Sequence, residues 1–218
     1  MRTALVFCGG GRSRVAITVA DEPLVIAADI GAVEALRLGF AVELLVGDMD
    51  SVPAAVVAEI EGAGGRIQRH PVDKDATDLD LALAAAASHG VERTLIVGGD
   101  GGRMDQLLGN AMVMISSRFA SMQMDAIFGR AQAHVIRDGR DLVGAPGETL
   151  SLFAVGGPAR GVSASGVRWP LDGATLEPGS SLGISNEFID VIARIEVEDG
   201  VVLAIRPGDL ALDEQGTS

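Results

Sequence analysis

The chain has 218 residues, of which 48% are hydrophobic, and its formal net charge is −13. This apolar fraction is sufficient for a packed core, so the composition excludes an intrinsically disordered chain. The negative charge argues against a nucleic-acid-binding surface, which needs clustered Lys and Arg side chains. It does not argue against a nucleotide ligand, because a metal ion held by carboxylates reverses the sign of the local charge.

A single cysteine, Cys8, excludes an internal disulfide and favours a reducing compartment. Cys8 ends an apolar run, so we expect a small buried core residue rather than a catalytic thiol. The first residues form too short an apolar run for a signal peptide, and no stretch approaches the roughly 20 apolar residues that a membrane-spanning helix needs. We therefore expect a soluble, cytoplasmic protein.

Apolar runs alternate with helical patterns in the first part of the chain, which predicts βαβ units and a doubly wound, mainly parallel sheet. The predicted strands are Ala4–Cys8, Leu24–Ala27, Glu43–Val46, Arg66–Arg69, Thr94–Val97 and Met124–Phe128. The predicted helices are Gly31–Leu38, Pro53–Gly62, Asp78–Ser88 and Met104–Arg118. Thr77 and Asp80 resemble a capping box at the start of the third helix, and Pro53 suits the first turn of the second.

The pattern changes near residue 131, where short β-like runs are separated by Gly, Pro and Asp. Examples of these runs are His134–Arg137, Thr149–Val155, Ile189–Val197 and Val201–Ile205. The stretch Glu198–Gly200 lies between the last two runs and is typical of a hairpin turn. We therefore predict an α/β N-terminal domain over residues 1–130 and a smaller all-β sandwich C-terminal domain over residues 131–218.

Acidic and glycine-rich residues follow three of the predicted strands. Asp29 follows the second strand, Asp48 and Asp50 follow the third, and a glycine run over residues 98–102 follows the fifth. Because ligands of open parallel sheets bind at the carboxyl ends of the strands, these residues are expected at one edge. Two carboxylates that converge at a strand end are suited to Mg²⁺. The alternatives are a helix cap for Asp29 and turn hydrogen bonds for Asp48 and Asp50.

The glycine run precedes Arg103 and a predicted helix. Glycine lets backbone amides approach phosphate, a helix N-terminus attracts anions, and Arg103 can add bidentate contacts. The run lacks the Gly-Lys-Ser/Thr ending of a Walker loop and is not a dinucleotide fingerprint. The earlier glycines 9–11 are a weaker signal that a tight strand exit also explains. Lys74 and Asp78 alone could form a surface ion pair.

Five stretches, in order along the chain, resemble the motifs of the thiamine pyrophosphokinase family. They are Asp29–Ala32, Gly47–Ser51, Lys74–Asp78, Gly98–Gln106 and Ser185–Asn186. The family motifs read Asp-Gly-Gly-Ala, Gly-Asp-Phe-Asp-Ser, Lys-(two or three residues)-Thr-Asp, Gly-Gly-x-Gly-Gly-Arg-x-Asp-His and Ser-Asn. The resemblance covers nearly the whole chain, including the change to β structure. Ile30, Met49 and Gln106 stand where the family has Gly, Phe and His, so we expect a hydrogen-bonding rather than a proton-transfer role for Gln106.

The resemblance implies a reaction in which the thiamine hydroxyl attacks the β-phosphorus of MgATP, AMP leaves and thiamine diphosphate forms. It also implies a homodimer with the active site at the subunit interface, ATP and Mg²⁺ on the first domain and thiamine on the second. The implied metal ligands are Asp48, Asp50 and Asp78, and the implied catalytic residues are Asp29, Lys74 and Asp105. The implied ATP-binding residues are Gly98, Gly101, Gly102, Arg103 and Gln106, and the implied thiamine-binding residues are Trp169, Ser185 and Asn186.

Trp169 is the only Trp in a chain without Tyr. An indole face attracts a cation with ~0.5–2 kcal/mol, so Trp169 could stack on thiamine, and an ordinary core residue is the alternative. The competing functions are a related diphosphokinase that acts on another hydroxymethyl heterocycle such as a pterin, a non-catalytic thiamine or nucleotide sensor, and a Mg²⁺-dependent nucleotide hydrolase. A sensor is expected to lack acidic residues of the metal site, which are present here, and a hydrolase leaves the second domain unexplained.

Overall fold

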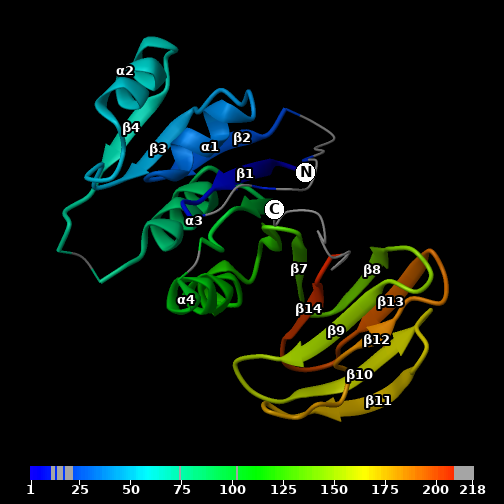
Figure 1. Cartoon of the computed structure of the whole chain (residues 1–218). Coiled ribbons are helices and arrows are strands. Elements are labelled where there is room, and N and C mark those ends of the chain that lie inside the picture. The colour runs from blue at the N-terminus through cyan, green and yellow to red at the C-terminus, as the bar shows by residue number, and fades with distance from the viewer. Residues whose placement is uncertain (11–12, 14–16, 18–21, 74, 102, 209–218) are drawn as a thin grey trace, which may run out of the picture. The chain divides into compact units, whose positions relative to one another are not determined.

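The computed structural model describes residues 1–10, 13, 17, 22–73, 75–101 and 103–208 (Figure 1). The chain divides into two compact units, Met1–Gly129 and Arg130–Ser218. No helix of the described residues is long and apolar enough to cross a membrane. Lys74 and Gly102, two of the predicted site residues, lie outside the described residues.

A parallel sheet forms the centre of the first unit. Its strands within the described residues are β1 (Thr3–Phe7), β2 (Leu24–Ala28), β3 (Leu44–Gly47), β4 (Arg66–Arg69), β5 (Arg93–Val97) and β6 (Gln123–Phe128) (Figure 1). Their order across the sheet is β6-β5-β1-β2-β3-β4, and each neighbouring pair is parallel. The strand order reverses between β1 and β5, which makes this position the switch point where ligands of open parallel sheets bind.

The strands of this sheet differ in burial. Every residue of β2 and β3 is buried, and so is most of β1, as expected for strands that are covered on both faces. The edge strand β4 is largely exposed. Phe7 of β1 packs against Phe40 with the ring centroids 5.3 Å apart. The core therefore lies around the central strands, whose carboxyl ends carry the predicted site residues.

Helices connect most of these strands. Their bounds are α1 (Gly31–Arg37), α2 (Ala54–Gly62), α3 (Asp78–Ser88) and α4 (Met104–Met114). Pro53 precedes α2 as its N-cap instead of lying in its first turn. α4 ends at Met114 and not at the predicted Arg118. The Ser116 hydroxyl accepts a hydrogen bond from the Arg118 amide at 3.3 Å, which favours the short 3₁₀ turn Ser117–Phe119 over a longer helix.

The second unit contains two antiparallel sheets in its described part. The strands are β7 (Ala131–Ile136), β8 (Gly139–Val143), β9 (Thr149–Ala154), β10 (Ala159–Ser165), β11 (Leu171–Leu176), β12 (Asn186–Glu187), β13 (Ile192–Glu196) and β14 (Val202–Arg206). One sheet has the order β12-β9-β14-β7 and the other β11-β10-β13-β8. Leu152 of the first sheet and Val162 and Ile195 of the second belong to one buried core, as in a β-sandwich.

The stretch Glu198–Gly200 is not a hairpin turn, so that prediction was wrong. β13 pairs with β8 and β10, whereas β14 pairs with β7 and β9, so the turn carries the chain from one sheet to the other. The Asp199 carbonyl accepts a hydrogen bond from the Arg160 amide at 2.8 Å, and Gly200 has a φ of +94°. The prediction assumed that two strands that follow each other in the sequence also pair with each other in a sheet. Such pairing is common but not general.

Candidate active site

A cavity of about 460 Å³ is lined by residues that follow β1, β2 and β3 and by residues of α3 and α4. The predicted site residues that line it are Asp29, Asp50, Asp78, Asp105 and Gln106. The charged side chains among its described lining residues are all carboxylates. The described lining of the cavity is therefore acidic, which favours an anionic ligand that carries a cation with it.

Three carboxylates, two of which line this cavity, form what we call the carboxylate cluster. Asp29, Asp48 and Asp50 each place one carboxylate oxygen within 4.8 Å of the other two. Asp29 is buried, Asp48 half-buried and Asp50 exposed. Carboxylates this close repel one another unless a cation lies between them, and hard oxygen ligands suit Mg²⁺. Asp78 is outside the cluster and lines the same cavity from the first turn of α3.

The backbone of the cluster is held in an uncommon conformation. Asp29 and Met49 have φ values of +46° and +67°, in the left-handed region that non-glycine residues rarely adopt. Met49 turns the chain sharply while its side chain packs in the core. The Asp48 Oδ1 atom accepts a hydrogen bond from the Asp50 amide at 3.1 Å. The turn that we considered as an alternative to a metal site therefore occurs together with the clustering of the carboxylates.

Asp29 carries an unsatisfied oxygen. Its Oδ1 atom is buried and has no hydrogen-bond partner within the described part of the chain. Burial raises the pKa of Asp29, and the charges of Asp78 and Asp48 raise it further, while the Ile30 amide and the neighbouring Ser51 side chain lower it. Asp29 does not cap α1, because the N-cap is Ile30 without a side-chain hydrogen bond. A buried acceptor without a donor is costly, so a bound cation would complete the site.

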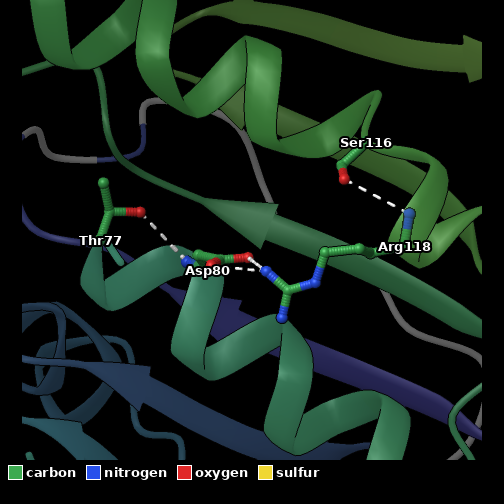
Figure 2. Close-up of polar contacts among 4 residues, drawn as sticks. All are labelled: Thr77, Asp80, Ser116 and Arg118. Atoms are coloured by element: carbon green, nitrogen blue, oxygen red, sulfur yellow. Dashed lines mark hydrogen bonds and ion pairs between the residues drawn. The ribbon is translucent and has the colours of Figure 1, made fainter. Parts of the chain in front are cut away.

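The start of α3, where Asp78 stands, is fixed by two contacts (Figure 2). The Thr77 hydroxyl accepts a hydrogen bond from the Asp80 amide at 3.2 Å, as expected for a helix cap. The Asp80 carboxylate accepts from the Arg118 guanidinium, with both oxygens 2.8 Å from Nη1. Asp78 therefore lies in a helix turn that is fixed by the Thr77 cap and by the contact between Asp80 and Arg118.

Cys8 lines the cavity as an inert group. Its burial, with a smaller contribution from the charge of Asp78, raises the pKa of the thiol to about 12. The thiol is protonated at neutral pH, and only the thiolate is a nucleophile. This agrees with the expectation that Cys8 is a buried core residue.

The described part of the glycine run after β5, residues 98–101, is called the glycine loop here, and it packs against Gly9 and Gly10, which follow β1. The Gly98 amide donates to the Ile127 carbonyl and the Gly99 amide donates to the Gly9 carbonyl, both at 3.0 Å. A Cβ atom on Gly101 would collide with the carbonyl of Gly10. Gly98, which we expected to bind ATP, therefore has no free backbone amide to offer to a phosphate group. Its φ of +89° shows that it serves to turn the chain.

Arg103 and Asp105 form an exposed ion pair beside the glycine loop. The Arg103 Nη2 and Nε atoms lie 2.6 and 3.2 Å from the Asp105 carboxylate oxygens. This contact raises the pKa of Arg103 and lowers the pKa of Asp105. A guanidinium has more N–H donors than the contact uses, so Arg103 can still donate to a phosphate group.

A second cavity, of about 470 Å³, lies beside Trp169 in the second unit. Its other lining residues are Leu171, Ser180, Ser181, Leu182, Gly183, Ile184 and Asn186. Trp169 is 53% exposed, so it is not the ordinary core residue that we considered as an alternative. The Arg168 guanidinium carbon lies 5.0 Å from the centroid of the indole ring and is held there by an ion pair with Glu187.

Asn186 holds the backbone of Trp169 in place. Its Oδ1 atom accepts from the amides of Trp169 and Glu187 at 3.0 and 2.9 Å, and its Nδ2 atom donates to the Trp169 carbonyl at 2.7 Å. Asn186 is buried, with 2% of its surface exposed. Ser185 is exposed, with a φ of +56° and an amide that donates to the Ser151 hydroxyl. Of the predicted Ser-Asn pair, Ser185 faces solvent and Asn186 is engaged within the protein.

Two polar residues at the first cavity were not assigned a role from the sequence. The Ser51 hydroxyl donates to Asp50 Oδ1 at 2.7 Å, although Ser51 lies in a stretch that the resemblance covers. Asn110 of α4 also lines the cavity. Its spacing of one helical turn from Gln106 is the signal that could have identified it, since such residues share a helix face.

Two family profiles match the chain in the order of its two units. The profile "Thiamin pyrophosphokinase, catalytic domain" matches residues 16–126, and "Thiamin pyrophosphokinase, vitamin B1 binding domain" matches residues 133–202. Thiamine pyrophosphokinase of Bacillus subtilis is 26% identical over 214 residues, which cover 96% of this chain and 100% of the relative. Thiamine pyrophosphokinase 1 of Oryza sativa subsp. japonica is 24% identical, with 78% of this chain and 68% of the relative covered.

Solved structures with the same names have similar folds. The crystal structure of thiamine pyrophosphokinase from Bacillus subtilis superposes with a TM-score of 0.84 at 25% identity, over 96% of this chain and 100% of that chain. Thiamin pyrophosphokinase from Candida albicans has a TM-score of 0.74 at 14% identity, over 94% and 88% of the two chains. At that lower identity the similarity concerns the fold alone.

Proposed function

The chain belongs to the thiamine pyrophosphokinase family, and we propose that it transfers a diphosphate group from ATP to the hydroxyl of thiamine, giving AMP and thiamine diphosphate. The observation that carries this proposal is the match of both a catalytic and a vitamin-binding profile, in the order of the two units. On this proposal residues 1–130 bind ATP with Mg²⁺ and residues 131–218 bind thiamine.

We propose that Asp48, Asp50 and Asp29 are ligands of Mg²⁺, with Asp78 contributing from α3. The spacing of the carboxylate cluster and the unsatisfied Oδ1 atom of Asp29 fit a divalent cation. Asp29, which the resemblance assigned to catalysis, is thus better suited to the metal ion. Mg²⁺ supplies charge neutralisation on the transferring phosphate groups.

The ATP phosphates meet an acidic cavity, so binding depends on cationic partners. Arg103 provides a guanidinium next to the glycine loop, and the resemblance adds Lys74 and the amide of Gly102. Gln106 lines the cavity and can donate a hydrogen bond to a phosphate oxygen. Asp105 orients Arg103 through their ion pair. Positioning and charge neutralisation account for most of the rate enhancement in phosphoryl-type transfer, so no general base is assigned.

Thiamine is proposed to bind in the cavity beside Trp169. The thiazolium ring carries a positive charge, and the exposed indole can stack on it. Asn186 keeps Trp169 in place through the backbone, while the exposed Ser185 can hydrogen-bond the aminopyrimidine. Asn186 is thus proposed to act on thiamine through Trp169.

A homodimer with the active site at the subunit interface remains part of the proposal. It is supported by a stripe of exposed apolar side chains on α4, formed by Met104, Leu108 and Met112 at helical spacing.

We also propose that the sheet of the first unit is doubly wound, because right-handed connections on both sides of the β1–β5 switch point place helices on both faces. The cytoplasmic location stays a prediction.

Product analysis tests the proposed function. The protein is mixed with ATP, Mg²⁺ and thiamine, and the products are followed by phosphorus NMR and chromatography. We expect AMP and thiamine diphosphate in equal amounts and neither product when Mg²⁺ is replaced by EDTA. AMP without thiamine diphosphate would indicate hydrolysis or another acceptor. A folded protein that forms neither product with Mg²⁺ present would contradict the proposal.

A further inference from the structure

Asn110 lies on α4 and lines the acidic cavity, although no motif of the resemblance includes it. Its Nδ2 atom donates a hydrogen bond to the carbonyl of Gly99 at 3.2 Å. This contact joins the helix that carries Asp105 and Gln106 to the glycine loop that precedes it in the sequence. The loop is therefore held by a side chain as well as by its covalent connection to α4.

The peptide groups of Gly99 are fixed on both sides. Its amide donates to the Gly9 carbonyl at 3.0 Å, and its carbonyl accepts from Asn110. Gly99 has a φ of +87°, and a Cβ atom there would lie 2.7 Å from the Asn110 amide nitrogen. Glycine is required at this position because of both its backbone conformation and the approach of Asn110.

A glycine-rich loop has more conformational freedom to lose than any other sequence, so its shape depends on such fixed points. Gly9 anchors the loop to the end of β1, and Gly98 is anchored to the Ile127 carbonyl at the end of β6. Among these hydrogen bonds, those to Gly9 and Ile127 join backbone groups, and only the one from Asn110 comes from a side chain. A substitution of Asn110 can therefore remove this one contact without altering a strand. Removing it frees one side of the Gly99 peptide.

We propose that Asn110 is a positioning residue that holds the glycine loop in the conformation that receives the nucleotide phosphates. The hydrogen bond from Asn110 orders the loop in the free protein. ATP binding therefore does not have to supply the free energy of ordering the loop. The loop-ordering part follows from the contacts of the free protein alone. The effect on ATP rests on the proposed function.

The test uses two variants of the full chain. Asn110→Asp keeps the shape of the side chain but cannot donate, and its charge repels the Gly99 carbonyl. Asn110→Ala removes the contact without adding charge. The matched control is Gln68→Glu, an amide-to-carboxylate change on the exposed edge strand β4. Hydrogen exchange of the free protein is measured by mass spectrometry, and KM is measured for ATP and for thiamine.

We expect both Asn110 variants to exchange the amides of the glycine loop about tenfold faster, as the loss of one hydrogen bond allows, with β5 and the rest of α4 unchanged. KM for ATP rises about tenfold while KM for thiamine changes less than twofold, because only the phosphate-binding loop is affected. Gln68→Glu matches the wild-type protein in all three measurements.

Unchanged loop exchange in both variants would overturn the proposal. So would faster exchange spread evenly over β5 and α4, because Asn110 would then be a general structural residue. Faster loop exchange with unchanged KM for ATP would remove the role in nucleotide binding. If the wild-type protein forms no thiamine diphosphate, the proposed function fails, and the exchange measurement alone still decides whether Asn110 orders the loop.

Discussion

The cavities of the two units differ in how far the protein satisfies its own polar groups. The first cavity is lined by Asp29, which has an unsatisfied buried oxygen, and by Asp50, and these two carboxylates and Asp48 lie within 4.8 Å of one another. The second contains Asn186, whose amide oxygen and nitrogen both bond to protein atoms. The described part of the first site therefore leaves a buried acceptor open to a ligand, whereas the second is held in place by its own hydrogen bonds.

This difference indicates which ligand each cavity suits. Carboxylates that lie this close together suit a metal–phosphate ligand, because its cation can lie between them. An exposed indole beside apolar and hydroxyl groups suits an organic cation with a flat ring. We therefore expect substitutions in the first cavity to affect turnover and metal dependence, and substitutions in the second to affect thiamine binding or stability.

The largest expected effect comes from Asp50→Ala. Removing one ligand of the carboxylate cluster is expected to lower kcat/KM by about 10³-fold or more, because metal-bound charge stabilisation is worth several kcal/mol. The fold should persist, since the Asp50 side chain is exposed. Steady-state kinetics and circular dichroism measure the two effects. Asp199→Ala, which removes an exposed carboxylate of the second unit, is the control; normal turnover by Asp50→Ala would contradict the metal assignment.

Asn186→Asp is expected to reduce stability. The variant loses the donor to the Trp169 carbonyl inside a buried site, which costs about 2 kcal/mol of the free energy of unfolding. KM for thiamine should rise and KM for ATP should stay the same. Urea denaturation and kinetics measure these quantities. Loss of stability with no change in KM for thiamine would mean that Asn186 does not position Trp169 for binding.

Trp169→Ala is expected to raise KM for thiamine about tenfold, because a cation over an indole gains ~0.5–2 kcal/mol. KM for ATP should not change. Trp169→Phe keeps a smaller aromatic face and should lose less. An equal rise of both KM values in Trp169→Ala would assign a structural role to this residue.

At neutral pH the smallest effect is that of Cys8, because its contribution changes only in alkaline solution. The folded protein holds the pKa of the thiol at about 12, above its ordinary value of 9.0, so the folded state retains a proton that the unfolded state loses. The stabilisation is complete below pH 9 and falls by about 1.4 kcal/mol per pH unit as the pH rises toward 12. Urea denaturation of the wild-type protein and of Cys8→Ala at several pH values tests this. A stability difference that is constant from pH 7 to pH 10.5 would contradict it.

Local sequence signals predicted the elements whose ends are set by a local contact. α3 has its predicted bounds, Asp78–Ser88, because the Thr77 cap lies next to it in the sequence. Asp29 and Asp50 line one cavity because neighbouring parallel strands end at the same edge. The glycine run after β5 was expected at the same edge, and the structure adds the contact of its Gly99 amide with the Gly9 carbonyl after β1.

Features that depend on tertiary contacts were not predictable. The place of Asp29 in the carboxylate cluster depends on the left-handed Met49 and on Gly47, where a Cβ atom would lie 3.1 Å from the Cβ of Asp29. β10 and β11 were missed because register shifts and left-handed glycines at 161 and 173 interrupt the alternation of buried and exposed residues. The partner of Asn186, Trp169, is distant in sequence.

A titration with Mn²⁺ followed by electron paramagnetic resonance tests the central claim most directly, that the carboxylate cluster is a divalent-cation site for the nucleotide. Mn²⁺ replaces Mg²⁺ at oxygen ligands and is directly observable. We predict saturable binding to the wild-type protein that is tightened by ATP, and loss of that binding in Asp50→Ala and Asp29→Asn but not in Asp199→Ala. Equal Mn²⁺ binding by the wild-type protein and both cluster variants would contradict the account.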